Sequence, residues 1–247
     1  MEWEGAALVL SARAYGESGA IVHLLTEEHG RTAAMVRGGA SRRQAAVWQP
    51  GNLVLARWQA RLSDQLGHVS AEPVQQASAR VLDRPFHLDM ISAVTAVADG
   101  ALPDREPHPQ LFLDLVRLIT AIAVLGDPPP MADLVRWERD LLAVLGYGLS
   151  LERCTVTGTT EELAFVSPKT GRAVSAEGAG PWRERLLPLP HFLLDSSDES
   201  RPDEWLHGLD LTGYFLSRHL FGARHSPVPE ARHRLRERVR AMVENAQ

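Results

Sequence analysis

Cysteine, lysine and long apolar segments are scarce in this chain of 247 residues. The single cysteine, Cys154, cannot form an intramolecular disulfide, and Lys169 is the only lysine. No apolar run is long enough to cross a bilayer, and the charged start of the chain, Met1 to Glu4, differs from a secretory signal peptide. We therefore expect a cytoplasmic protein with no membrane partner, associated with the nucleoid if it binds DNA.

Sequence motifs for catalysis and metal binding are also missing. The chain contains neither a Gly-x-x-x-x-Gly-Lys-Ser/Thr phosphate loop nor a His-Glu-x-x-His motif, and Gly16–Gly19 lacks the spacing of a nucleophile elbow. The ten histidines are scattered, without a pair spaced to bind a metal together with a third donor. We predict no catalytic residue, no metal and no cofactor. A hydrolase or nuclease with an unrecognised site stays open as an alternative.

Acidic residues are absent between Arg31 and Arg61, a stretch that contains six arginines. The whole chain has a formal charge of −5, so the other residues are strongly acidic in sum. Such a separation of charge is typical of a local surface that binds a polyanion such as a nucleic acid. The alternative is a solvated basic loop without a ligand.

The centre of this basic stretch combines glycines with cations, in the order Arg37-Gly38-Gly39-Ala40-Ser41-Arg42-Arg43. The glycines let a phosphate approach the backbone, and Ser41 and the guanidiniums supply hydrogen-bond donors. We predict that the principal phosphate contacts are Arg37, Arg42 and Arg43, and that the flanking groove contains Arg13, Arg31, Arg57 and Arg61. Trp48 and Trp58 either stack on bases or pack in the protein core.

Five short segments in the first 75 or so residues have the apolar or alternating pattern of β-strands. Five short strands in so short a segment favour a small closed barrel, and the oligonucleotide-binding (OB) fold is the common one that presents a basic face to nucleic acid. We therefore assign an α+β class, with an OB-fold nucleic-acid-binding domain over residues 1–78. The expected strands are 7–10, 21–26, 32–36, 53–58 and 67–72.

The pattern changes to a helical period from Asp83 onward, with proline-rich joints between the segments. We predict an α-helical bundle domain over 79–247, with a small polar, hairpin-rich insert at about 152–178. The arginine-rich tail, 232–240, is expected to be a solvated helix rather than a second binding site. The expected helices lie near 88–98, 111–125, 131–145 and 205–221.

Two blocks of this sequence resemble a known family. Gly16-Glu17, Ile21-Val22, Leu24 to Arg31 and Val36 to Arg43, followed by Gln49-Pro50-Gly51, resemble the N-terminal signature of the bacterial RecO recombination mediators. Leu145 to Cys154, with Phe165 to Pro168 and Gly171, is similar to the end of a helix and the zinc insert that follows it in that family.

The resemblance implies an OB-fold domain, a helical domain and a role in DNA repair. It implies binding of single- and double-stranded DNA, annealing of complementary strands, and help for RecA in replacing single-strand-binding protein (SSB). The implied partners are RecR and the acidic C-terminal tail of SSB, with no cofactor. Binding of the SSB tail needs an apolar pocket with cations beside it, and the candidate cations are Arg117, Arg136 and Arg139. An OB-type module that binds RNA or single-stranded DNA outside repair is the alternative.

The sequence departs from the family where many members bind a structural zinc with four cysteines. Cys154 matches the first of these, but Thr157 stands at the second position and the next histidine is His191. One thiolate cannot make a tetrahedral structural zinc site. We therefore predict an insert without zinc, held by packing of Leu163, Phe165 and Val174.

Overall fold

The computed structural model describes residues 1–39, 41–61, 66–195 and 200–246. The chain forms two compact units, which are described separately below. The first consists of Met1–Pro129 with Pro229–Arg232, and the second of Pro130–Val228 with His233–Gln247. The domain boundary predicted near residue 78 lies inside the first unit. None of the helices in the described ranges is both long enough and apolar enough to cross a membrane.

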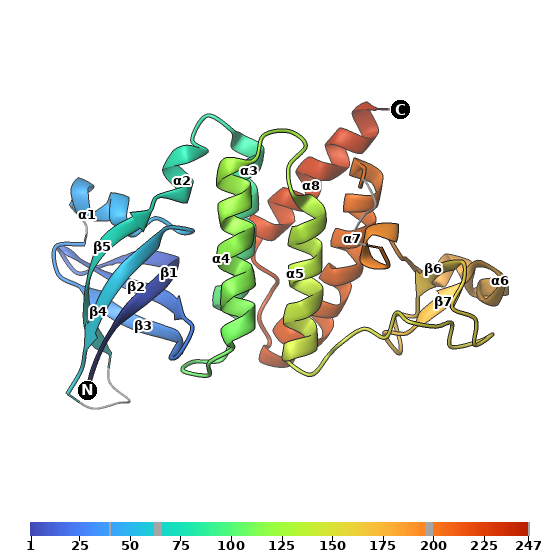
Figure 1. The fold of residues 1–247 in the computed structure, drawn as a ribbon, viewed down its shortest axis with the longest axis horizontal. Helices are drawn as coiled ribbons and strands as arrows, with labels where there is room; N and C mark the ends of the chain where they lie inside the picture. The colour runs from blue at the N-terminus through green and yellow to red at the C-terminus, as the bar shows by residue number, and fades with distance from the viewer. Residues whose placement is uncertain (40, 62–65, 196–199, 247) are drawn as a thin grey trace. The chain divides into compact units, whose positions relative to one another are not determined.

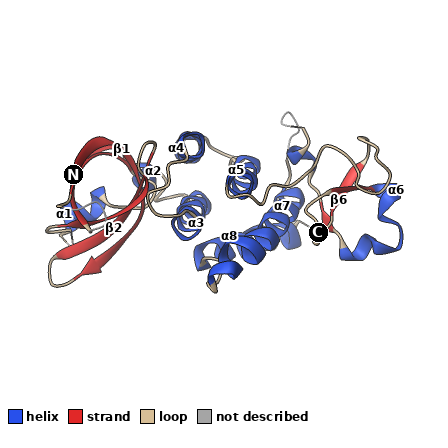
Figure 2. Ribbon diagram, turned by 90° about the horizontal axis from the view of Figure 1, so that it is seen from below, coloured by secondary structure: helices blue, strands red, loops and turns tan. Residues whose placement is uncertain are grey.

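The first unit begins with a closed five-stranded barrel, which confirms the predicted OB architecture (Figures 1 and 2). The strands close in the order β1-β2-β3-β5-β4, in which β3 and β5 are parallel and the other pairs antiparallel. A short helix, α1 (Arg42–Val47), lies between β3 and β4. The strands are β1 (Glu2–Tyr15), β2 (Gly19–Thr26), β3 (Gly30–Val36), β4 (Leu53–Gln59) and β5 (Gly67–Gln75).

Alternation along each strand fills the interior of the barrel. In β4, Val54, Ala56 and Trp58 are buried, whereas Arg57 and Gln59 between and beyond them are exposed. Trp58 is 4% exposed and Trp48 only 1%, so both tryptophans belong to the barrel core. Of the two roles considered for them, base stacking and core packing, the structure supports core packing.

Three helices complete the first unit: α2 (Ala77–Arg80), α3 (Pro85–Ala101) and α4 (Pro109–Val124). Helix α3 packs against β1, and α4 packs against β2 and α2 (Figure 2). Both long helices begin with proline in the first turn, where the missing N–H costs no hydrogen bond. Their apolar stripes, which include Ile91 and Ile119, are buried as the sequence predicted.

Gly30, at the start of β3, lets the barrel approach the segment that joins α3 to α4. Its φ is +61°, and a Cβ there would lie 2.2 Å from the carbonyl oxygen of Glu106. Gly30→Ala is expected to lower the free energy of unfolding by about 3 kcal/mol, because left-handed strain and a backbone clash add together. Gly16→Ala is the matched control, since Gly16 has φ +64° but open space around it. Equal losses in urea denaturation of the two variants would contradict the proposed contact.

The second unit contains three longer helices and a small insert. Its helices are α5 (Met131–Val144), α7 (Pro202–Phe215), which continues as a π-helical turn over Leu216–Phe221, and α8 (Glu230–Asn245). Helices α5 and α7 pack together, and the buried Thr212 hydroxyl of α7 donates a hydrogen bond to Glu138 of α5. The insert has a three-stranded sheet in the order β7-β6-β8, from β6 (Leu163–Val166), β7 (Ala173–Ser175) and β8 (Leu187–Pro188).

Candidate nucleic-acid interface

An open cleft of about 370 Å³ lies on the outside of the barrel, over β3, β4, β5 and α1. Two of the predicted arginines, Arg37 and Arg57, line it together, and its described lining residues include no carboxylate. Its other polar lining comes from neutral groups and a histidine that the sequence analysis did not single out. These are Gln44, Gln59, His68 and Ser70, and the remaining lining residues are Met35, Val36, Val69 and Ala71.

Strand pairing explains why these residues meet. The parallel pairing of Met35 with His68 brings the end of β3 beside the start of β5. The antiparallel pairing of Arg57 with Ser70 and of Gln59 with His68 places β4 on the other side of β5. Because side chains alternate between the two faces of a strand, the polar members of these pairs share the outer face while Trp58 and Val69 point inward.

Arg57 is available to an anion although it has a carboxylate partner. Its Nη2 lies 2.7 Å from Oε2 of Glu4, the residue opposite it on β1. Both side chains are well exposed, at 64% and 49%, so solvent screens the pair. A phosphate can therefore displace the Glu4 carboxylate from Arg57, or share the guanidinium with it, at a small cost in free energy. Arg37 is exposed and has no carboxylate partner among the described residues.

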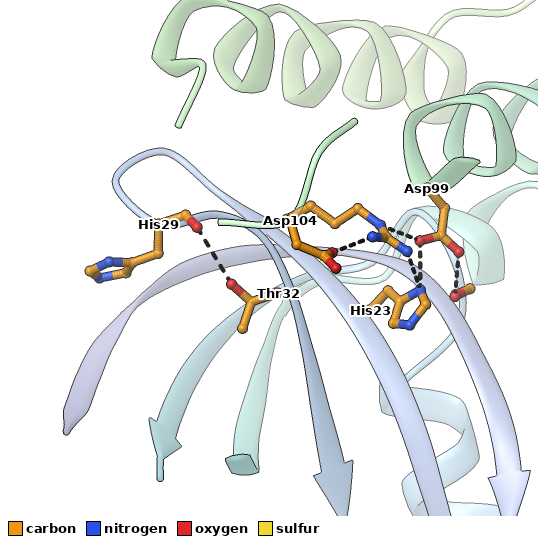
Figure 3. Close-up of polar contacts among 7 residues, drawn as sticks. His23, His29, Thr32, Asp99 and Asp104 are labelled. Atoms are coloured by element: carbon orange, nitrogen blue, oxygen red, sulfur yellow. Dashed lines mark hydrogen bonds and ion pairs between the residues drawn. The ribbon is translucent and has the colours of Figure 1, made fainter. Parts of the chain in front are cut away.

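Arg31 differs from the other predicted contacts because it is held in a network with His23 and Asp99, which are labelled in Figure 3. Its Nε donates to Oδ1 of Asp99 at 2.8 Å, and its Nη1 donates to Asp104. Nδ1 of His23 lies 2.6 Å from the same Asp99 oxygen, and Ser11 donates to the other at 2.8 Å. Arg31 is only 17% exposed and lies six residues, or about 20 Å, along β3 from Arg37. The structure thus places it outside the cleft.

The carboxylate at the centre of this network is strongly stabilised in its charged form. Burial would raise the pKa of Asp99, but hydrogen bonds from His23 and Arg31, with a further one from Ser11, lower it from 3.8 to about 2. Asp99 therefore stays ionised at every physiological pH. It ties β1, β2 and β3 to α3, so the network acts as a structural connection within the first unit.

The remaining predicted contacts lie apart from the cleft or outside the described side chains. Arg13 is exposed on the β1–β2 hairpin beside a separate recess that also includes Pro50, and Arg61 is exposed just after β4. Arg42 and Arg43 begin helix α1, but their side chains lie outside the described residues. The hydroxyl of Ser41, expected to meet a phosphate, caps this helix by accepting from the Gln44 N–H.

Several arginines elsewhere in the chain have intramolecular partners. Among the candidates for binding the SSB tail, Arg117 pairs with Asp114 and Arg139 with Asp140, while Arg136 donates to the Phe192 carbonyl and pairs with Asp133. In the arginine-rich tail, Arg236 pairs with Asp210 and Glu237, and Arg240 with Glu237. The predicted terminal helix is present as α8, although its first arginine, Arg232, is buried and not solvated.

The insert's cysteine is held by hydrogen-bond donors, not by further metal ligands. Sγ of Cys154 accepts from the backbone N–H groups of Val156, Thr157 and Ser175 and from the Ser175 hydroxyl, at 3.2–3.4 Å. Burial raises the pKa of Cys154, but these hydrogen bonds outweigh it and lower the pKa to about 6. One thiol surrounded by hydroxyls does not fit zinc, and the described residues contain no group of three potential ligands. Of the residues expected to hold the insert, Leu163 and Val174 are buried and Phe165 is half-buried.

Comparison with known protein families identifies the family of this chain. Residues 1–77 match the family model described as Recombination protein O N terminal, and residues 86–227 match Recombination protein O C terminal. The chain belongs to the recombination protein O family. Membership supports a role in DNA repair and recombination, and the family is one of recombination proteins rather than enzymes, as the sequence predicted.

Individual RecO relatives match over nearly the whole chain. A protein named DNA repair protein RecO from Gluconacetobacter diazotrophicus is 52% identical, over 100% of this chain and 98% of its own length. Proteins of the same name from Granulibacter bethesdensis and Phenylobacterium zucineum are 50% and 49% identical, over 99% and 97% of this chain and 98% of each relative. The resemblance seen in the sequence is therefore confirmed.

Proposed function

We propose that this chain is a recombination mediator that binds single- and double-stranded DNA through its barrel and anneals complementary strands. In this proposal it also helps to load RecA, together with RecR, on single strands coated with SSB. The observation that carries the proposal is the cleft on an OB barrel that Arg37 and Arg57 both line, with no carboxylate among its described lining residues. The DNA-binding domain of the proposal is residues 1–78.

The chemistry of the cleft suits a DNA backbone better than DNA bases. Two guanidiniums neutralise adjacent phosphates, and Gln59, His68 and Ser70 supply further hydrogen bonds to oxygen. Among the described residues, His68 is the one aromatic side chain that lines the cleft, because Trp58 packs inside the barrel. Binding of this kind depends on charge and tolerates any base sequence. Annealing requires this tolerance, because the protein must bring together complementary strands of any sequence.

The protein partners of the proposal come from the family resemblance. The proposed direct partners are RecR and SSB, the latter through its acidic tail. RecA is the protein whose loading on DNA this chain is proposed to assist. The proposed setting is the nucleoid. Since Arg136 donates two hydrogen bonds to the Phe192 carbonyl, Arg117 and Arg139 are the freer of the three candidate cations for the SSB tail.

Strand annealing on SSB-coated DNA tests this function directly. Two complementary labelled oligonucleotides, each coated with SSB, are expected to anneal faster when the protein is added without any nucleotide. The acceleration should weaken as salt rises, because charge neutralisation drives binding. The acceleration of annealing by the R37A/R57A variant should be smaller than that by the wild-type protein by a factor of about ten or more.

Other outcomes of this assay separate the alternatives. Binding of naked strands without annealing of coated ones would contradict the mediator role and leave a general OB-type binding module. Tighter binding of RNA than of DNA of the same sequence would favour the RNA-binding alternative.

A further inference from the structure

The insert of the second unit exposes a large aromatic side chain. All six tryptophans of the chain are described, and four of them, at positions 48, 58, 137 and 205, are less than 5% exposed. Trp3 is half-buried in a stack with His29 and Trp58, whereas Trp182 is 58% exposed. The face of an exposed indole is open to a flat partner such as a nucleic-acid base.

Local backbone geometry presents this ring together with a cation. Trp182 lies in a 3₁₀ helix, η1 (Gly180–Arg185), which follows α6 (Ala176–Ala179) through Gly180 at φ +43°. Side chains three residues apart are eclipsed in a 3₁₀ helix, so Arg185 lies over Trp182. Its Cζ is 5.3 Å from the ring centroid, a cation–π contact that holds both side chains in place.

Two further cations lie in the same insert. Cζ of Arg183 lies 5.4 Å from the Phe165 ring centroid, also in a cation–π contact. The pairing of Val166 with Leu187 brings the end of η1 to the same end of the sheet as the Ser167–Thr170 turn, which carries the exposed Lys169. Among the described residues, none of these three cations has a carboxylate partner within 4.0 Å.

We propose that Trp182 stacks on an unpaired base of single-stranded DNA, while Arg183, Arg185 and Lys169 neutralise the adjoining phosphates. This inference rests on the proposed function and adds a second DNA contact to it. An aromatic face flanked by guanidiniums matches a nucleotide, with its flat base between two phosphates. Single strands are favoured because bases in a duplex are already stacked on one another. The three residues that follow the ring on η1 are Arg183, Glu184 and Arg185, so their net charge is positive.

The second contact differs in kind from the first. The barrel cleft offers charge and hydrogen bonds to a backbone, whereas η1 offers a ring to a base. A chain with two separate contacts of this sort can hold two strands, or two parts of one strand, at the same time. Holding two strands at once raises their local concentration and thereby speeds annealing.

Tryptophan fluorescence of the full chain tests the inference, with an oligo-dT strand as the probe. We expect the oligonucleotide to quench the emission of the wild-type protein, and we expect the quenching to disappear in W182F but persist in the matched control W205F. W182F should bind with nearly wild-type affinity because the phenyl ring still stacks. W182A should bind about tenfold more weakly by fluorescence anisotropy.

Two results would overturn the inference. One is saturating oligo-dT binding without quenching of Trp182, and the other is equal affinity of W182A and wild type, which would point to a protein partner for the ring. The R37A/R57A variant separates this inference from the proposed barrel function. If that variant binds as tightly as wild type while W182A does not, the barrel assignment fails and the stacking contact stands.

Discussion

Asp99→Asn is expected to lower the free energy of unfolding by about 2–4 kcal/mol at neutral pH, one of the largest effects of any single substitution outside the apolar core. The carboxylate accepts hydrogen bonds from Ser11 and Arg31, and His23 lies within hydrogen-bond distance of it. Asparagine keeps the shape but removes the charge that the buried guanidinium requires. Urea denaturation followed by circular dichroism measures the loss.

The same substitution should change how stability depends on pH. The pKa of Asp99 is about 2 in the folded chain and 3.8 ordinarily, so the unfolded chain takes up the proton first as pH falls. The stabilisation is therefore complete above about pH 4 and is lost as pH falls toward 2. At about 1.4 kcal/mol per pKa unit, its size is about 2 kcal/mol. The difference in stability between wild type and Asp99→Asn should shrink over this window.

Asp104→Asn provides a matched control because Asp104 binds the same guanidinium from a position that is 68% exposed. Its loss should stay below about 1 kcal/mol, as for other surface ion pairs. If the two variants lost equal stability, or if the Asp99→Asn difference stayed constant between pH 5 and pH 2, the buried network would not have the role assigned to it.

The double variant R37A/R57A is expected to weaken binding of single-stranded DNA by about 10- to 100-fold at low salt. Each arginine lost removes one phosphate contact and the counterion release that accompanies it. The slope of log affinity against log salt should therefore decrease by about 1.4 for a single strand. Fluorescence anisotropy of a labelled oligonucleotide over a salt series gives both quantities.

Two further variants test whether position or total charge matters. R117A/R201A removes the same charge from exposed ion pairs outside the cleft, and it should leave affinity and slope close to wild type. R37K/R57K keeps the charge and should keep most of the slope while losing the bidentate geometry of arginine. Equal weakening by R37A/R57A and R117A/R201A would show that DNA responds to net charge and not to the cleft.

The barrel could be predicted from the sequence because each central strand has one buried face. The alternation of Val54, Ala56 and Trp58 with outward side chains produces a period of two that is visible without a structure. The hairpin formed by the end of β1 and the start of β2 gave no such signal, because most of its residues, such as Arg13 and Tyr15, are exposed on both faces. The predicted first strand was therefore much shorter than the observed β1.

The site could be predicted only in part, because contacts between distant segments decide which arginines are available. Arg31 shares the sequence signal of Arg37, but its partner Asp99 lies 68 residues away on α3. Conversely, Gln59, His68 and Ser70 join the cleft through strand pairing alone and have no distinctive spacing. Local charge thus pointed to a segment that includes cleft-lining residues, and only the fold separates Arg37, which lines the cleft, from Arg31, which is held in the network.

The most direct test of the central claim is to locate the DNA on the protein by photo-crosslinking a single-stranded oligonucleotide and identifying the crosslinked peptides. The account predicts crosslinks in the segments that line the cleft, at the end of β3, in β4 after Val54, and in β5 near His68. These crosslinks should disappear in R37A/R57A. A bound oligonucleotide that crosslinks to α8 or elsewhere in the second unit, and never to the barrel, would contradict the claim that the cleft binds DNA.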